Sequence, residues 1–140
     1  MIDGITRFAF PTTISFGPGA IQQLPEILQE LDVHKPLLVT DPVLKTTNVY
    51  STASTVLRDS GTPFAVSANV RPNPPIEDVA VALAVYRSNN CDGVIALGGG
   101  STLDAAKVMR VLVVNEGPLI RYDIQTGGNS QIQGPLPPMI

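Results

Sequence analysis

The stretch that decides the fold is residues 93–107, Gly93-Val94-Ile95-Ala96-Leu97-Gly98-Gly99-Gly100-Ser101-Thr102-Leu103-Asp104-Ala105-Ala106-Lys107. The continuous apolar run over 93–97 predicts a buried central strand of a parallel sheet. Three glycines follow it, and residues 102–114 then have the pattern of a helix that Ser101 caps. A strand that passes through a glycine turn into a helix predicts a β-α unit.

The three glycines indicate a phosphate-binding turn. Gly98, Gly99 and Gly100 have no β-carbon, so they permit positive φ angles and let a ligand approach the backbone closely. The first turn of the following helix offers unpaired N–H groups at the positive end of the helix dipole, which suits a pyrophosphate. Only the first half of the pattern G-x-G-x-x-G is satisfied, because Leu103 stands where the last glycine would be. A tight strand-to-helix turn with a serine cap is the alternative.

Outward from this turn, short apolar runs alternate with helix-like segments over most of the chain. Strands are expected at 8–16, 36–40, 64–66 and 93–97, and helices at 20–31, 49–59, 76–88 and 102–114. This alternation with short links predicts right-handed β-α-β units and an α/β fold, with a Rossmann-like, open, mainly parallel sheet and flanking helices. Four phenylalanines are expected in the core: Phe8, Phe10, Phe16 and Phe64.

Composition limits the classes of function. The 140 residues are 44% hydrophobic and carry a formal net charge of -3, which fits one folded domain and gives no basic patch for nucleic acid. No apolar stretch is long enough to span a bilayer and no signal peptide is recognisable, so a cytoplasmic location is expected. Cys91 and His34 are each the only residue of their kind. An internal disulfide, a His/Cys metal site and a Ser-His-Asp triad are therefore not expected.

The segment 98–107 resembles the GGGS-x-x-D-x-A-K motif of the iron-containing (group III) alcohol dehydrogenase family. Residues 14–20, 38–41 and 71–74 fit the family in order and spacing. The resemblance implies a dinucleotide-binding α/β domain over 1–117, followed over 118–140 by a Pro/Gly-rich loop and the start of a further strand, cut by the end of the chain. The family's all-helical domain supplies an aspartate and three histidines to a divalent metal, iron or zinc, and that domain is absent from this chain.

The resemblance also implies a function. The complete enzyme would be a metal-dependent, alcohol dehydrogenase-like oxidoreductase that interconverts alcohols and aldehydes or ketones by hydride transfer, without nucleic-acid or membrane partners. Its cofactor is expected to be NAD, with NADP left open, and the fragment alone is expected to be inactive. Domains of glycerol dehydrogenase, maleylacetate reductase or a dehydroquinate-synthase-like enzyme stay open, as does a non-catalytic nucleotide- or phosphosugar-binding module. The oligomeric state is also open, a homodimer included.

The individual polar residues each have two interpretations. Asp41 follows the second expected strand, where a carboxylate suits a ribose hydroxyl and disfavours a 2′-phosphate, but it also suits the cap of the next helix. Asn73 suits a helix cap as well, and the resemblance implies contact with the nucleotide. Asp104 is expected beside the nicotinamide end, or in a capping box with Ser101. With Lys107 it suits an i,i+3 ion pair.

The residues expected to bind the cofactor are Asp41, Asn73, Gly98, Gly99, Gly100, Ser101 and Asp104. No catalytic or metal-binding residue is expected in this chain. On the last expected helix, Asp104, Lys107 and Arg110 form a polar stripe that is typical of a solvated face. Cys91 is expected to be a small core residue and His34 to lie in an exposed loop.

Overall fold

The computed structural model describes residues 12–140, and at its centre is a three-stranded parallel sheet. The strands, in the spatial order β2-β1-β3, are β1 (Pro36–Val39), β2 (Ala65–Ser67) and β3 (Gly93–Ala96). Leu38 of the central strand lies opposite Val66 on one side and Ile95 on the other. The predicted α/β class with an open parallel sheet is confirmed.

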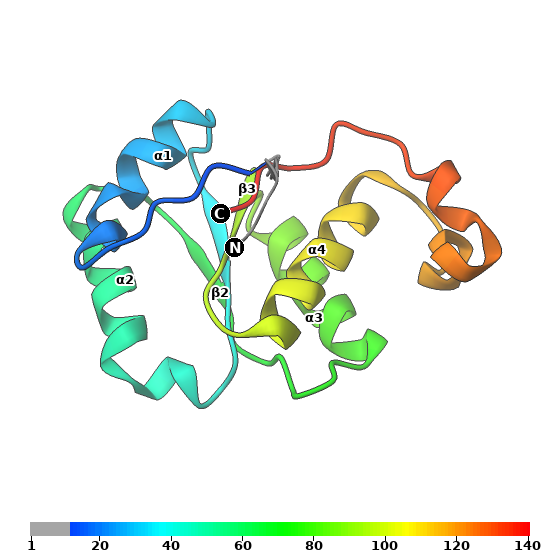
Figure 1. Cartoon of the computed structure of the whole chain (residues 1–140), viewed down its shortest axis with the longest axis horizontal. Helices are drawn as coiled ribbons and strands as arrows, with labels where there is room; N and C mark the ends of the chain where they lie inside the picture. The colour runs from blue at the N-terminus through cyan, green and yellow to red at the C-terminus, as the bar shows by residue number, and fades with distance from the viewer. Residues whose placement is uncertain (1–11) are drawn as a thin grey trace, which may run out of the picture.

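Helices cover both faces of the sheet (Figure 1). One face carries α1 (Leu24–Glu30) and α2 (Asn48–Asp59), and the other carries α3 (Ile76–Ser88) and α4 (Gly100–Val114). The prediction of a helix over 76–88 is confirmed at both ends. None of the described helices is both long and apolar enough to cross a membrane.

The core lies in two clusters, one on each face of the central strand. Leu37 and Val39 pack with residues of α3 and α4, whereas Leu38 packs with residues of α1 and α2. Successive side chains of a strand point to opposite faces. A strand that is covered on both faces is therefore apolar at every position, as the sequence of β1 is.

Proline divides the first predicted helix, 20–31, into two parts. Residues 20–23 form the 3₁₀ turn η1 (Ala20–Gln23), and the α-helix begins at Leu24 with Pro25 in its first turn. Proline has no N–H group and is tolerated in the first turn of a helix but not inside it. A second short turn, η2 (Leu44–Thr46), joins β1 to α2.

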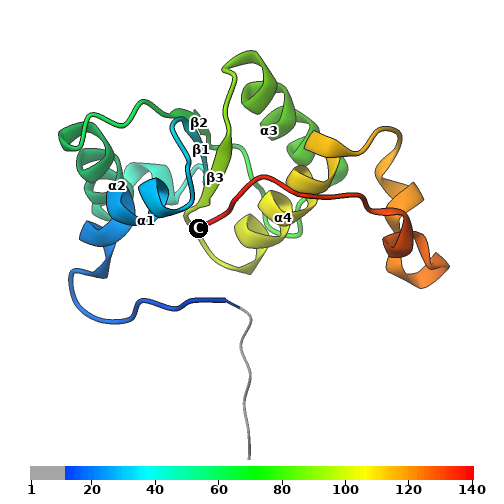
Figure 2. The same cartoon turned by 90° about the horizontal axis from the view of Figure 1, so that it is seen from above.

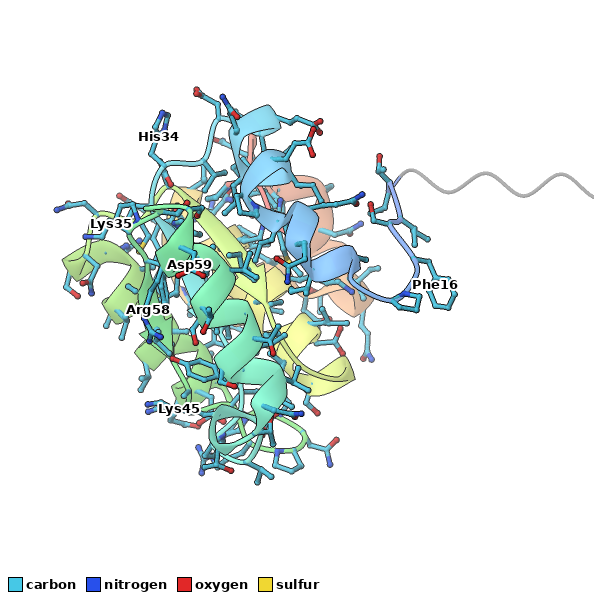
Figure 3. All side chains as sticks on the ribbon, turned by 90° about the vertical axis from the view of Figure 1, so that its left-hand side faces the viewer. Phe16, His34, Lys35, Lys45, Arg58 and Asp59 are labelled. Atoms are coloured by element: carbon cyan, nitrogen blue, oxygen red, sulfur yellow. The ribbon has the colours of Figure 1, made fainter. Side chains whose placement is uncertain are left out.

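The strand expected over 8–16 is not found in its described part. Phe8 and Phe10 lie outside the described residues, and residues 12–16 belong to no strand. The expectation that Phe16 is a core residue is wrong: its side chain is 99% exposed and stands off the body of the protein (Figure 3). An even spacing of apolar residues buries one face of a strand only where a neighbour covers it, and nothing described covers this ring. Phe64, in contrast, packs against the α1–α2 cluster.

The last residues leave the body of the protein and then return to the sheet (Figure 2). Three short 3₁₀ turns come first: η3 (Leu119–Tyr122), η4 (Ile124–Thr126) and η5 (Gly128–Gln131). Met139 then forms a parallel bridge with Val94 of β3, and Arg110 of α4 donates to the carbonyl oxygen of Pro137. The expectation of a solvated Arg110 is wrong, because its guanidinium anchors the returning segment. The division of the chain at residue 117 stays a prediction.

Candidate functional site

The carboxyl ends of the three strands lie at one edge of the sheet, the lower edge in Figure 1. The loops that follow the strands begin there, and α4 begins directly behind the last of them. In an open parallel sheet, ligands bind beyond this edge. All seven residues predicted to bind the cofactor lie on these loops or in the first two turns of α4.

The N-terminus of α4 has no side-chain cap. The helix begins at Gly100, its N-cap is Gly99 with φ -88° and ψ -167°, and no side chain among residues 12–140 bonds to the N–H groups of the first turn. The prediction that Ser101 caps the helix is therefore wrong, because this residue lies inside the first turn. The N–H groups of Gly100, Ser101 and Thr102 have no acceptor within the described part of the chain; the first backbone bond here joins Leu103 N–H to the Gly99 carbonyl. The donors that an anion needs are available.

Of the two properties expected of the three glycines, positive φ angles are absent, and the close approach of a ligand stays a prediction. None of them has a positive φ, so conformational freedom does not explain them. A β-carbon on Gly98 would collide with the buried side chain of Thr102, whose Cβ would lie 2.7 Å away. A β-carbon on Gly99 or Gly100 would meet nothing within 4 Å. The turn is open to solvent at all three glycines, so a charged ligand has access to the helix N-terminus.

Two of the predicted residues, 28 positions apart in the chain, lie in contact. The backbone N–H of Asn73 donates to Oγ of Ser101 at 3.3 Å. Asn73 has φ +50°, which asparagine tolerates better than most residues. Asn73 does not cap α3, because the N-cap of that helix is Pro75, which makes no side-chain bond. The helix starts this late because a residue that precedes a proline is disfavoured in the helical region, and both Asn73 and Pro74 precede one. The β2–α3 loop is therefore tied to the first turn of α4.

Asp41, at the carboxyl end of β1, closes the turn that leads to η2. Its Oδ1 accepts hydrogen bonds from the N–H groups of Val43 and Leu44, at 2.9 and 2.7 Å. Asp41 is nevertheless not the N-cap that one of its two interpretations expected, because the N-caps of η2 and α2 are Val43 and Thr47. Oδ2 has no partner among the described residues, so the carboxylate keeps one oxygen for a ligand, and the ribose contact stays a prediction.

Asp104 lies beside a largely apolar pocket of about 410 Å³. Its Oδ1 is 3.6 Å from Nζ of Lys107 and both side chains are exposed, so the i,i+3 ion pair is present. The capping box with Ser101 is absent, because that hydroxyl accepts from the β2–α3 loop instead. Asp104 and Asn73 are the polar residues of the pocket, and the others are Pro74, Ile76, Val79, Ala105, Val108 and Leu119. The pocket brings two predicted residues to one place.

Thr40 is a structural residue of this edge that the sequence prediction missed. It is fully buried, and its Oγ1 donates to the carbonyl of Leu97 at 2.7 Å. Its backbone N–H donates to the carbonyl of Ser67, and its carbonyl accepts from Val70 at 3.4 Å. One residue thus joins the ends of all three strands. A threonine directly after an apolar strand was the available signal.

A second residue that the prediction missed, Asp78, holds the β2–α3 loop. Only 5% of this residue in the first turn of α3 is exposed. Its carboxylate accepts from the backbone N–H of Arg71 at 2.9 Å and from Nη2 of the same residue at 2.7 Å. Hydrogen bonds from the guanidinium and the backbone N–H hold the pKa of Asp78 below its usual range, and the same pairing raises the pKa of Arg71.

Histidine and cysteine take no part in this site. Cys91 is buried as expected, and burial raises the pKa of its thiol, which disfavours the thiolate. His34 is exposed at the opposite end of the α1–α2 side from Lys45, which belongs to η2 (Figure 3). No group of three His, Cys, Asp or Glu residues that could hold a metal ion exists within residues 12–140.

A parallel sheet covered on both faces by helices, with a helix N-terminus behind an open glycine turn, defines an open α/β domain. A family model described as iron-containing alcohol dehydrogenase matches residues 11–140. The chain belongs to the iron-containing alcohol dehydrogenase family, and the resemblance seen in the sequence is confirmed.

The relatives of this chain are longer proteins. Choline dehydrogenase of Bacillus subtilis is 35% identical over 132 residues, which are 94% of this chain and 33% of that protein. 1,3-Propanediol dehydrogenase of Klebsiella pneumoniae is 35% identical over 95% of this chain and 34% of its own length. The crystal structure of NADH-dependent butanol dehydrogenase A from Thermotoga maritima has a TM-score of 0.82 at 29% identity, over 96% of this chain and 33% of that one. The chain spans about a third of the length of these relatives.

Proposed function

We propose that this chain is the NAD-binding part of an alcohol dehydrogenase-like oxidoreductase that interconverts alcohols and aldehydes or ketones. The observation that carries the proposal is the N-terminus of α4, where three N–H groups lack acceptors within residues 12–140 and face an open glycine turn. The likeness to a butanol dehydrogenase that is named NADH-dependent supports the choice of cofactor.

The residues present fit a dinucleotide. The N–H groups of Gly100, Ser101 and Thr102 would hold the pyrophosphate, assisted by the dipole of a 15-residue helix. The free Oδ2 of Asp41 would accept from a ribose hydroxyl, and its charge would repel a 2′-phosphate, so NAD is favoured over NADP. Asn73, beside the pocket, would contact the nucleoside. When bound, NAD takes up or returns a hydride, and that chemistry belongs to the cofactor.

The described residues do not form a site for the family's metal. No step of the reaction is therefore assigned to a metal held by this chain. The role proposed for the chain is to bind and orient the cofactor and to provide one wall of the substrate cleft. By itself it is expected to bind nucleotide without oxidising alcohols, because no catalytic residue is assigned to it.

Calorimetry on the 140-residue chain tests the proposal, with NADH, ATP and a sugar phosphate as ligands. Tighter binding of NADH than of the other two is the expected result. A preference for ATP or for the sugar phosphate would contradict it and support a non-catalytic nucleotide- or phosphosugar-binding module. Steady oxidation of a primary alcohol by the purified chain with NAD and iron would contradict the division of roles.

A further inference from the structure

The loop between β2 and α3 has few backbone contacts of its own. Three of its residues, Pro72, Pro74 and Pro75, are prolines and have no N–H group to donate. Its first residues are tied by the bond from Val70 N–H to the carbonyl of Thr40. The conformation of the rest, which includes a residue with positive φ, therefore depends on bonds from side chains.

Two such bonds flank the tip of the loop. Asp78 accepts from the N–H of Arg71, and Ser101 accepts from the N–H of Asn73, two residues further on. Asp78 also binds Nε and Nη2 of the Arg71 side chain, so this residue is held by both its backbone and its guanidinium. A buried carboxylate with several charge-assisted bonds has a well-defined position, and here that position is set by the first turn of α3.

We propose that Asp78 is a positioning residue for the nucleotide: through Arg71 it fixes the β2–α3 loop so that Asn73 faces the ligand, and it touches no ligand itself. This inference rests on the proposed function. Since the pyrophosphate would be held by the N-terminus of α4, loss of Asp78 is expected to affect the nucleoside contact and to spare the phosphate contact. That difference separates positioning from a general effect on folding.

The test is calorimetry of the 140-residue chain with two probes, NADH and inorganic pyrophosphate. Asp78→Asn is expected to weaken NADH binding about tenfold, the size of one lost charge-assisted hydrogen bond, with pyrophosphate binding unchanged. Asn73→Ala is expected to act alike. The double variant should bind NADH no more weakly than either single variant, because the two residues act through one contact. Glu77→Gln removes the same charge from the same turn of α3 and is expected to bind both probes as the wild type does.

The results that would overturn the inference are distinct. The inference is wrong if Asp78→Asn binds NADH with wild-type affinity, or if it loses equal affinity for NADH and for pyrophosphate. It is also wrong if the losses of NADH affinity add up in the double variant. None of these three results contradicts the proposed function. If the wild type binds neither probe, the proposed function fails and the inference fails with it. Should Asp78→Asn not fold by circular dichroism, Arg71→Lys replaces it. This variant keeps the charge but loses the bidentate guanidinium contact. It is expected to weaken NADH binding several-fold without affecting pyrophosphate binding.

Discussion

Oγ1 of Thr40 donates a hydrogen bond of 2.7 Å to the carbonyl of Leu97, and so joins the end of β1 to the residue that precedes the glycine turn. The two residues are 57 positions apart in the chain. The N–H of Leu97 donates in turn to the carbonyl of Val39 at 2.9 Å. The start of the candidate phosphate site is therefore fixed against the central strand of the sheet.

Replacement of Thr40 by valine should lower the free energy of unfolding by about 1–3 kcal/mol. Valine has nearly the same shape, but it leaves the Leu97 carbonyl without its donor in a partly buried place. Thr40→Ser keeps a hydroxyl group and should lose less free energy of unfolding than Thr40→Val. Urea unfolding measures both variants. Equal stability of the valine variant and the wild type would show that this bond does not hold the turn.

Alanine at Gly98 and at Gly100 should have opposite effects. At Gly98 the new methyl group would strike the side chain of Thr102, so about 1–3 kcal/mol of stability should be lost through overpacking. At Gly100 the methyl group enters open space in the first turn of α4, and alanine is the better helix former, so stability should rise by up to about 0.5 kcal/mol. Thermal unfolding of the two variants compares them directly. A similar loss of stability in both variants would show that the turn is not open at Gly100.

Asn115 should hold the base of the segment that carries η3, η4 and η5. It is buried, its Nδ2 donates to the carbonyl of Gln133 at 3.1 Å, and its Oδ1 accepts from the N–H of the same residue at 2.8 Å. Asn115→Ala leaves both backbone groups unpaired, which should cost about 1–3 kcal/mol and speed hydrogen exchange over 118–132. Asn129→Ala, an exposed site in the same segment, is the control. Unchanged exchange in Asn115→Ala would show that the segment is held elsewhere.

Acid should weaken the fold partly through Asp78. Its pKa is lowered in the folded chain, so the unfolded chain binds the proton first and the contribution to stability is complete above the unfolded pKa of about 4. It is lost as pH falls through the folded pKa. Urea unfolding at pH 7 and pH 3 should therefore show a smaller drop for Asp78→Asn than for the wild type. The same drop in both proteins would mean that this carboxylate does not contribute.

Periodicity and turn chemistry predicted the fold because both are local. Apolar runs located the three described strands, and the predicted helix over 76–88 has the observed limits. The glycine turn was found for the same reason. The role of Ser101 was not, because its hydroxyl binds a residue 28 positions away, and capping rules consider only neighbours within one turn. Thr40 was missed because its partners lie on the neighbouring strands. Asp78 was missed because its partner, seven residues earlier, reaches it only through the conformation of the β2–α3 loop. Phe16 was misplaced because spacing does not show what covers a face.

The most direct test of the central claim is the affinity for NADH of the variant Gly99→Asp. Gly99 is the N-cap of α4, and aspartate is among the best caps, so the melting temperature should stay equal or rise. Its carboxylate would occupy the donors and repel a pyrophosphate, so NADH affinity should fall about tenfold or more. Gln29→Glu, which adds the same charge at an exposed position of α1, should bind NADH as tightly as the wild type does. NADH affinity in Gly99→Asp equal to that of the wild type would show that the N-terminus of α4 does not hold the pyrophosphate.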